Sequence, residues 1–282
     1  LYRLSDLQGN ELDALDKVWP LMPAQRKLGL LEDLELLAEA NTVLQFDRVC
    51  NIGLKDEYER VRVVAIRSLW ESERPELIGI FLEMLNRDAS VSVQAQAASA
   101  LGRFVQLGEL EKIGAARLRE IEDRLLRLMD EDVDPTIRRR ALEALGYSSR
   151  AEVVDHIDEA YQSDEADWQA SALFAMGRSY DQRWVPQVMD HIDDANAELS
   201  LEAVRAAGEL EIEETVPALL SLLEDDLDEI RMAAAWSLSQ IGGNGVADAL
   251  EGLKAQSEDE DEIDLIENAL ENLAFNDELE QL

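Results

Sequence analysis

Cysteine, histidine and long apolar runs are scarce in this chain. Cys50 is the only cysteine, which excludes an internal disulfide and a cysteine-rich metal site. His156 and His191 are the only histidines, and neither precedes a glutamate, so the sequence lacks the His-Glu pairs of a histidine-based iron centre. No run approaches the ~18 to 20 apolar residues of a membrane span. We therefore expect no metal, no cofactor and no membrane association.

The lone cysteine also indicates the compartment. Free thiols persist in reducing surroundings, so we expect a cytoplasmic protein in which Cys50 is a small buried residue. The chain begins with Leu1 rather than Met, which leaves open a targeting segment before it.

Basic residues are few, at 26 Lys and Arg against 62 Asp and Glu, which gives a net charge of −36. Residues 151–282 hold 35 acidic and 5 basic residues. Binding to nucleic acid and to anionic membranes depends on Lys and Arg, so we expect neither partner. A protein with a basic surface is the natural complement. Solubility and adaptation to salt are the alternative explanations of the charge, the latter because only 5 of the basic residues are Lys.

A motif of about 31 residues recurs along the chain. It consists of an Asp, an apolar anchor five residues later, usually an Arg after the anchor, and small residues four and seven positions beyond the anchor. Such a period predicts a solenoid of stacked helix pairs. The anchors are Val61, Val93, Ile137, Trp168, Leu199 and Ile230, so successive steps are 32, 44, 31, 31 and 31 residues.

Each repeat predicts two antiparallel helices, the second of which carries the motif. The small residues allow neighbouring helices to approach closely, and the Asp is placed to cap the second helix. The Arg is placed to pair with an Asp in its own or a neighbouring repeat. Glycines recur nine residues after four anchors, where we interpret them as helix terminators: Gly102, Gly146, Gly177 and Gly208.

These residues resemble the HEAT family, and within it the short repeats of the phycobilin lyase type, with residues 132–146 the nearest copy. The resemblance implies an all-α, right-handed solenoid of about seven to eight helix pairs, with the second helices lining a concave face. Repeat four lacks the Asp at its usual place, and repeat five has Ser200 where Arg is usual. The resemblance transfers no lyase activity, because fold does not determine function.

We expect residues 1–282 to form one solenoid. Residues 1–44 are expected to form capping helices, within stretches 4–19, 22–40 and 42–54 of helical pattern. Residues 45–245 hold the repeats, with an insertion near 106–116, and residues 246–282 hold a degenerate capping repeat and an acidic, polar tail from residue 276.

Two groups of residues are candidates for binding a partner. The positions two and six residues after the anchors are expected on the concave face, and in the C-terminal repeats they are apolar, aromatic or Arg, as interface hot spots are: Phe174, Leu201, Arg205, Met232 and Trp236. The second group is a loop with two Arg and two aromatic residues: Arg178, Tyr180, Arg183 and Trp184. The alternatives are burial of the first group between helices, and a structural hairpin over Trp184 with its Arg residues paired locally.

No catalytic motif is present: the sequence has no P-loop, no glycine-rich dinucleotide turn and no nucleophile elbow. The sequence therefore favours a non-catalytic scaffold that binds a basic protein or peptide. A partner-dependent enzyme subunit, such as a lyase-type protein, and a self-assembling protein are the alternatives.

Overall fold

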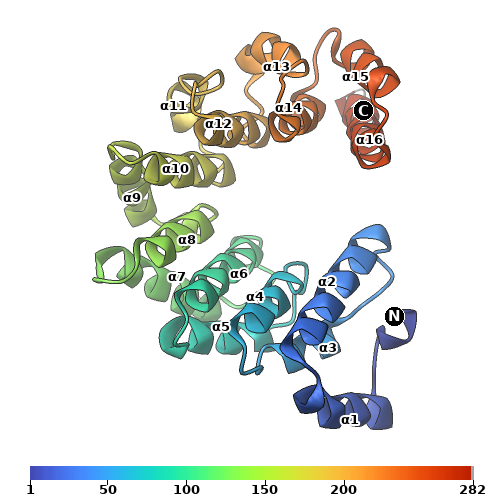
Figure 1. Cartoon of the computed structure of the whole chain (residues 1–282). Coiled ribbons are helices and arrows are strands. Elements are labelled where there is room, and N and C mark those ends of the chain that lie inside the picture. Colours follow the sequence, from blue (N-terminus) through green and yellow to red (C-terminus); the bar gives the residue numbers. More distant parts are fainter. Residues whose placement is uncertain (281–282) are drawn as a thin grey trace. The chain divides into compact units, whose positions relative to one another are not determined.

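The computed structural model is all-helical over residues 1–280, which are the residues that it describes, with side chains described to Asn276 (Figure 1). It consists of two compact units, unit 1 (Leu1–Leu145) and unit 2 (Gly146–Leu282). Within residues 1–280 there is no strand, and no helix has the length and apolar character that a membrane crossing needs. The all-α fold class is therefore confirmed. Whether residues 1–282 form one continuous solenoid stays a prediction.

Unit 1 contains eight α-helices, and its even-numbered helices pack in succession as the second helices of the pairs (Figure 1). The stretch 42–54 is helical only from residue 47, because Asn41 and the residues after it form a turn. The helices are α1 (Gly9–Val18), α2 (Ala24–Ala40), α3 (Asp47–Gly53), α4 (Glu59–Arg67), α5 (Glu76–Arg87), α6 (Val91–Glu109), α7 (Ala115–Asp130) and α8 (Pro135–Leu145).

The insertion near residues 106–116 lengthens α6 and α7 and adds a short turn between them. The helix α6 has 19 residues and α7 has 16, and both pack on α8. The extra residues therefore extend the stack of unit 1 and do not form a long open loop.

Unit 2 repeats the same pairing. Its second helices α10, α12, α14 and α16 pack side by side, and α9, α11, α13 and α15 each pack against the second helix that follows (Figure 1). The predicted tail from residue 276 is helical through Glu280, and residues 281–282 lie outside the described residues. The helices are α9 (Ala151–Tyr161), α10 (Ala166–Arg178), α11 (Val185–Met189), α12 (Ala197–Glu209), α13 (Val216–Leu222), α14 (Asp228–Ile241), α15 (Val246–Gln256) and α16 (Glu260–Glu280).

The recurrent glycines are contact points between second helices. The prediction that they terminate helices is wrong for Gly102, Gly177 and Gly208, which lie inside α6, α10 and α12, whereas Gly146 directly follows the last residue of α8. A Cβ added to Gly177 would lie 2.9 Å from the Cα of Ala206, and one added to Gly208 would lie 2.7 Å from the Cα of Ser237. Gly102 and Gly146 meet Ala144 and Ala175 in the same way, at 3.0 and 2.9 Å. Each glycine thus faces the small residue seven positions after the next anchor, because only a residue without a Cβ permits this approach.

In unit 2 the chain reverses three residues after the glycine position. Tyr180, Glu211 and Gly242 have φ angles of 52°, 52° and 73°, and they are spaced by 31 residues. This left-handed conformation costs little for glycine and more for other residues. It ends the second helix and turns the chain towards the next first helix.

The repeated Asp organises the turn before the second helix. Asp56, Asp88, Asp194 and Asp225 each accept the N–H of the residue two positions later, at 2.7 to 3.0 Å. That residue is the N-cap of the helix in every case, so the Asp closes a turn and does not itself cap the helix, contrary to the sequence interpretation.

In three repeats the residue after the anchor binds the same turn from the other side. Arg62, Gln94 and Arg231 donate to the main-chain carbonyls of Asp56, Asp88 and Asp225 at 2.6 to 2.9 Å. Ser200, at the position where Arg is usual, donates to the carbonyl of Ile192 at 2.9 Å. The expected Arg–Asp pairing between repeats occurs at Arg62, whose guanidinium also binds Asp88 of the next repeat with two bonds of 2.7 and 2.8 Å.

A buried ion pair anchors the first turn of unit 1. Lys27 is 2 % exposed and Asp56 is 6 % exposed, and the Lys27 Nζ donates to the Asp56 carboxylate at 2.7 Å. The indole of Trp19 donates to the same oxygen at 2.7 Å. Burial alone would raise the pKa of Asp56, but the hydrogen bonds from Lys27, from the Tyr58 N–H and from Trp19 lower it below its ordinary value.

Candidate functional site

The second helices of unit 2 present a row of apolar and aromatic side chains. Leu201 and Met232 occupy equivalent positions on the neighbouring helices α12 and α14, and both are partly exposed. Trp236, one turn further along α14, is 37 % exposed, and Arg205 of α12 occupies the position equivalent to it. The structure thus places these four predicted residues on adjacent helices. We call Leu201, Arg205, Met232 and Trp236 the second-helix strip.

Phe174, predicted for the same face, is partly covered by an internal contact. The guanidinium of Arg178 lies 5.1 Å from the centre of the Phe174 ring and 5.4 Å from that of Tyr147. Arg178 also pairs with Glu209 at 3.0 Å, which joins the end of α10 to the end of α12. Because this cluster of charge and rings links neighbouring helices, Phe174 and Arg178 have a structural role within unit 2.

Glu209 carries the largest ionisation change in this cluster. Burial raises its pKa to about 7, with a smaller raising contribution from Glu202, while Arg178 and Arg205 act in the opposite direction. The carboxylate therefore changes its protonation near neutral pH, beside the second-helix strip.

The loop after α10 has the features of a structural hairpin, which was the alternative to a partner-binding loop. Trp184 is 3 % exposed and lies in the core, so its ring is not presented to a partner. Arg183 pairs with Asp181 at 2.6 Å, and the side chain of Asp181 accepts the Arg183 N–H. Tyr180 is exposed, and its left-handed backbone belongs to the regular turn of the repeat.

Every basic side chain of unit 2 is already paired. The six Lys and Arg residues from Gly146 onward each form an ion pair within the described residues: Arg150, Arg178, Arg183, Arg205, Arg231 and Lys254. Unit 2 has 35 acidic residues, which leaves an excess of 29 carboxylates. The surface around the strip is therefore negative, and a positively charged molecule is attracted to it.

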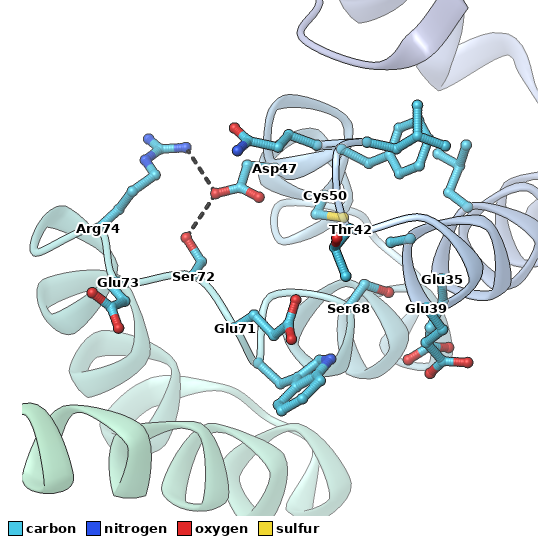
Figure 2. Close-up of a pocket in the computed structure, with 16 residues that line it drawn as sticks. Glu35, Glu39, Thr42, Asp47, Cys50, Ser68, Glu71, Ser72, Glu73 and Arg74 are labelled. Atoms are coloured by element: carbon cyan, nitrogen blue, oxygen red, sulfur yellow. Dashed lines mark hydrogen bonds and ion pairs between the residues drawn. The ribbon is translucent and has the colours of Figure 1, made fainter. Parts of the chain in front are cut away.

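Unit 1 contains a cavity of about 490 Å³ that the sequence analysis did not identify (Figure 2). Its walls come from α2, from residues 42–46, from α3 and from the segment after α4. Figure 2 shows Glu35 and Glu39 on one side and Asp47 with Arg74 on another. The lining residues are Leu34, Glu35, Ala38, Glu39, Thr42, Leu44, Gln45, Phe46, Asp47, Cys50, Ser68, Trp70, Glu71, Ser72, Glu73 and Arg74.

A departure from the repeat explains the cavity. Position 70 is nine residues after the anchor Val61, where four other repeats have the glycine that contacts the next helix, but here it is Trp70. The helix α4 ends at Arg67, before that position, and Trp70 is 59 % exposed. An aromatic residue at the glycine position was the sequence signal for this site.

Two further groups of side chains are of types that can carry reactive chemistry. Burial raises the pKa of the Cys50 thiol to about 12, with additional contributions from Asp47 and Glu35, so the thiol is neutral and a poor nucleophile. In unit 2, the Tyr161 hydroxyl lies 3.2 Å from His191 Nε2, and His191 Nδ1 lies 2.7 Å from Asp194. This chain of bonds links α9 to the turn before α12.

Among the described residues, no three His, Cys, Asp or Glu side chains are arranged to hold a metal ion.

Comparison with known proteins agrees with this architecture. Residues 185–274 match the family of HEAT repeats, whereas no curated protein matches the chain. The complex of CpcE and CpcF of phycocyanin lyase from Nostoc sp. PCC7120 contains a chain that is similar in structure, with 17% identity and a TM-score of 0.52, over 80% of this chain and 94% of that chain. Human deoxyhypusine hydroxylase is 15% identical, with a TM-score of 0.42, over 94% and 96% of the two chains. Residues 185–274 are thus similar to HEAT repeats in sequence, and the all-helical fold is similar to that of the Nostoc chain.

Proposed function

We propose that this protein is a non-catalytic scaffold that binds a basic protein or peptide on the second-helix strip of unit 2. The observation that carries the proposal is the combination of an exposed Trp236, flanked by Leu201 and Met232, with an acidic surface whose own basic residues are all paired. Aromatic and aliphatic side chains supply contact area in interfaces.

Charge determines which partner the strip favours. Exposed acidic residues stand at the start of the helices that carry the strip, Glu198 on α12 and Glu229 on α14, whereas the neighbouring Asp228 pairs with Arg231. Carboxylates that lack internal partners steer basic molecules towards the strip and discriminate against acidic ones. We therefore expect a partner segment with apolar side chains between Lys or Arg residues.

The HEAT-repeat fold supports a binding role without specifying the partner. HEAT-like solenoids present extended surfaces made of equivalent positions on successive repeats. The similar Nostoc structure is a complex of two different chains. That likeness concerns the fold, so a lyase subunit and self-assembly remain the alternatives that the experiment must separate.

The experiment is affinity capture from a lysate of the source organism with three forms of the chain. The first is the wild type, and the second carries Leu201→Ala, Met232→Ala and Trp236→Ala. The third is a matched control in which three exposed apolar residues of unit 1 are replaced, Tyr2→Ala, Leu21→Ala and Leu110→Ala. We expect the wild type and the control to retain the same basic protein, and the strip variant to lose it.

Reconstitution with the purified partner then completes the test. Its affinity should decrease steeply as salt is added, because the attraction is electrostatic. Equal retention by all three forms would contradict binding at the strip. A mass above 31.6 kDa for the isolated chain in solution, with no other protein retained, would support self-assembly.

A further inference from the structure

The C-terminal ends of α2 and α4 line the cavity of unit 1, together with the first turn of α3. Glu39 is in the last turn of α2, and Ser68 and Trp70 follow the last residue of α4. The carbonyl end of a helix carries a partial negative charge that favours cations. The α2 end has no basic residue in its last turn, and Glu35 and Glu39 are like charges four residues apart. Because Arg67 of α4 already pairs with Glu35, Glu39 is the carboxylate at this end of α2 that favours a positively charged occupant.

The carboxylates of the cavity differ in whether they already have a partner. Glu35 accepts Arg67 Nε at 2.7 Å, Glu73 pairs with Arg103 at 2.5 Å, and the Asp47 carboxylate accepts the Ser72 hydroxyl at 2.7 Å. Asp47 also has Arg74 within 3.7 Å. Across the described residues, neither Glu39 nor Glu71 forms an ion pair, and both are exposed on the cavity wall.

The remaining walls suit an organic cation with an alkyl stem. Leu34, Ala38, Leu44 and Phe46 form an apolar side, and the exposed Trp70 is an aromatic surface of the type that attracts ammonium and guanidinium groups. The volume of about 490 Å³ is in the range of small-ligand sites. The lining carboxylates do not converge as metal ligands in the part of the chain that the structure describes, which argues against an inorganic cation.

We propose that this cavity binds the side chain of a Lys residue in a basic peptide, with the alkyl stem against the apolar wall and the ammonium group between Glu39, Glu71 and Trp70. The site goes beyond the proposed function, because it lies on unit 1 and shares no residue with the second-helix strip. It supplies a second point of attachment for a basic protein, and a second point raises affinity by increasing the effective concentration at the first.

The test is NMR spectroscopy of the full chain, with the indole N–H signal of Trp70 as the reporter and Trp70→Phe used to assign it. The probe is an acetylated, amidated Gly/Ser peptide with one central Lys, added at physiological ionic strength. The negative probe has norleucine instead of Lys, and free 1,5-diaminopentane represents a small amine from another source. We expect a saturable shift of the Trp70 signal with the Lys peptide and none with the norleucine peptide.

Two matched variants separate a specific site from general attraction. Glu39→Gln with Glu71→Gln removes the two unpaired carboxylates of the cavity, and Asp13→Asn with Asp16→Asn removes two exposed charges of α1. We expect the first to weaken binding roughly fivefold to tenfold and the second by less than about twofold. Glu71 lies in a turn and not in a helix. Glu71→Gln alone is therefore a milder variant.

Three results would overturn the proposal. They are the absence of a Trp70 shift with the Lys peptide, equal weakening by the two double variants, and binding of diaminopentane without binding of the peptide. Since the strip variant leaves unit 1 unchanged, failure at this cavity and failure at the strip are separate outcomes.

Discussion

Unit 1 and unit 2 use the same repeat, but they fill its positions differently. In unit 2 the glycine contacts, the left-handed turns and the step of 31 residues recur regularly. In unit 1 the step varies, one glycine position holds Trp70, and one turn contains the buried pair of Lys27 and Asp56. Their charges also differ, with 27 acidic and 20 basic residues in unit 1 against 35 and 6 in unit 2.

The difference shows where a repeat protein concentrates specific features. Positions that contact the next repeat are under the same steric requirement everywhere, so a change at one of them alters local structure. At Trp70 the helix is short and a cavity opens beside it. In unit 2 the contacts of Gly146, Gly177 and Gly208 are kept, and exposed positions of the second helices differ between repeats, as Arg205 and Trp236 do.

The largest effect is expected from Lys27→Met in unit 1. It leaves the Asp56 carboxylate buried without its cation, which costs about 3 to 5 kcal/mol of unfolding free energy. Hydrogen exchange should show the loss of protection in α2, α3 and α4 while unit 2 keeps its protection. Lys17→Met, at an exposed lysine of α1, is the control and should change little. Equal loss in both units would mean that they unfold together.

The pH dependence of unit 2 should change with Glu209→Gln. Because the pKa of Glu209 is raised in the folded state, its contribution to stability is complete below the unfolded pKa of about 4.5 and is lost as pH rises through about 7. The difference between these two pKa values corresponds to an upper limit of about 3 to 4 kcal/mol. Denaturation of the wild type and the variant from pH 4 to 9 should give curves that differ progressively above about pH 5, with the variant more stable at high pH.

The control for this titration is Glu213→Gln, which removes the same charge from an exposed position in unit 2. If it reproduced the effect of Glu209→Gln, the general acidity of the unit would be the cause and burial would not.

Gly208→Ala tests the contacts between second helices. The added Cβ would lie 2.7 Å from the Cα of Ser237, and main-chain atoms cannot move aside, so we expect a loss of about 2 kcal/mol. Gly252→Ala is the matched control, because nothing lies within 4 Å of its added Cβ in α15. It should stabilise α15 by about 0.5 to 1 kcal/mol through helix propensity. Thermal unfolding distinguishes the opposite signs.

The smallest effect is expected from Glu211→Gly. The φ of Glu211 is 52°, so glycine relieves its left-handed strain, although it also increases the freedom of the unfolded chain. We expect a net gain of about 0.5 kcal/mol, measured as an increase in Tm. Glu213→Gly, outside the left-handed position, should be destabilising instead.

The fold was predictable because its periodic signals are local. The anchors and small residues indicated the second helices, and the positions of Leu201 and Trp236, two and six residues after their anchors, indicated the face on which they lie. The role of Gly177 was not predictable in the same way, since a glycine near a helix end permits both a turn and a close contact. The pocket of unit 1 depends on where α4 stops, and helix ends are set by tertiary contacts that one sequence does not display.

The glycine contacts of unit 2 have a consequence for how such a chain can change length. Gly177 faces Ala206 and Gly208 faces Ser237 through the same geometry, so removal of residues 178–208 would bring Gly177 opposite Ser237 and recreate an equivalent junction. A segment of 31 residues is therefore an interchangeable module that duplication or excision can add or remove without a new interface. The length of the array, and with it the number of side chains that can meet a partner, varies in whole modules.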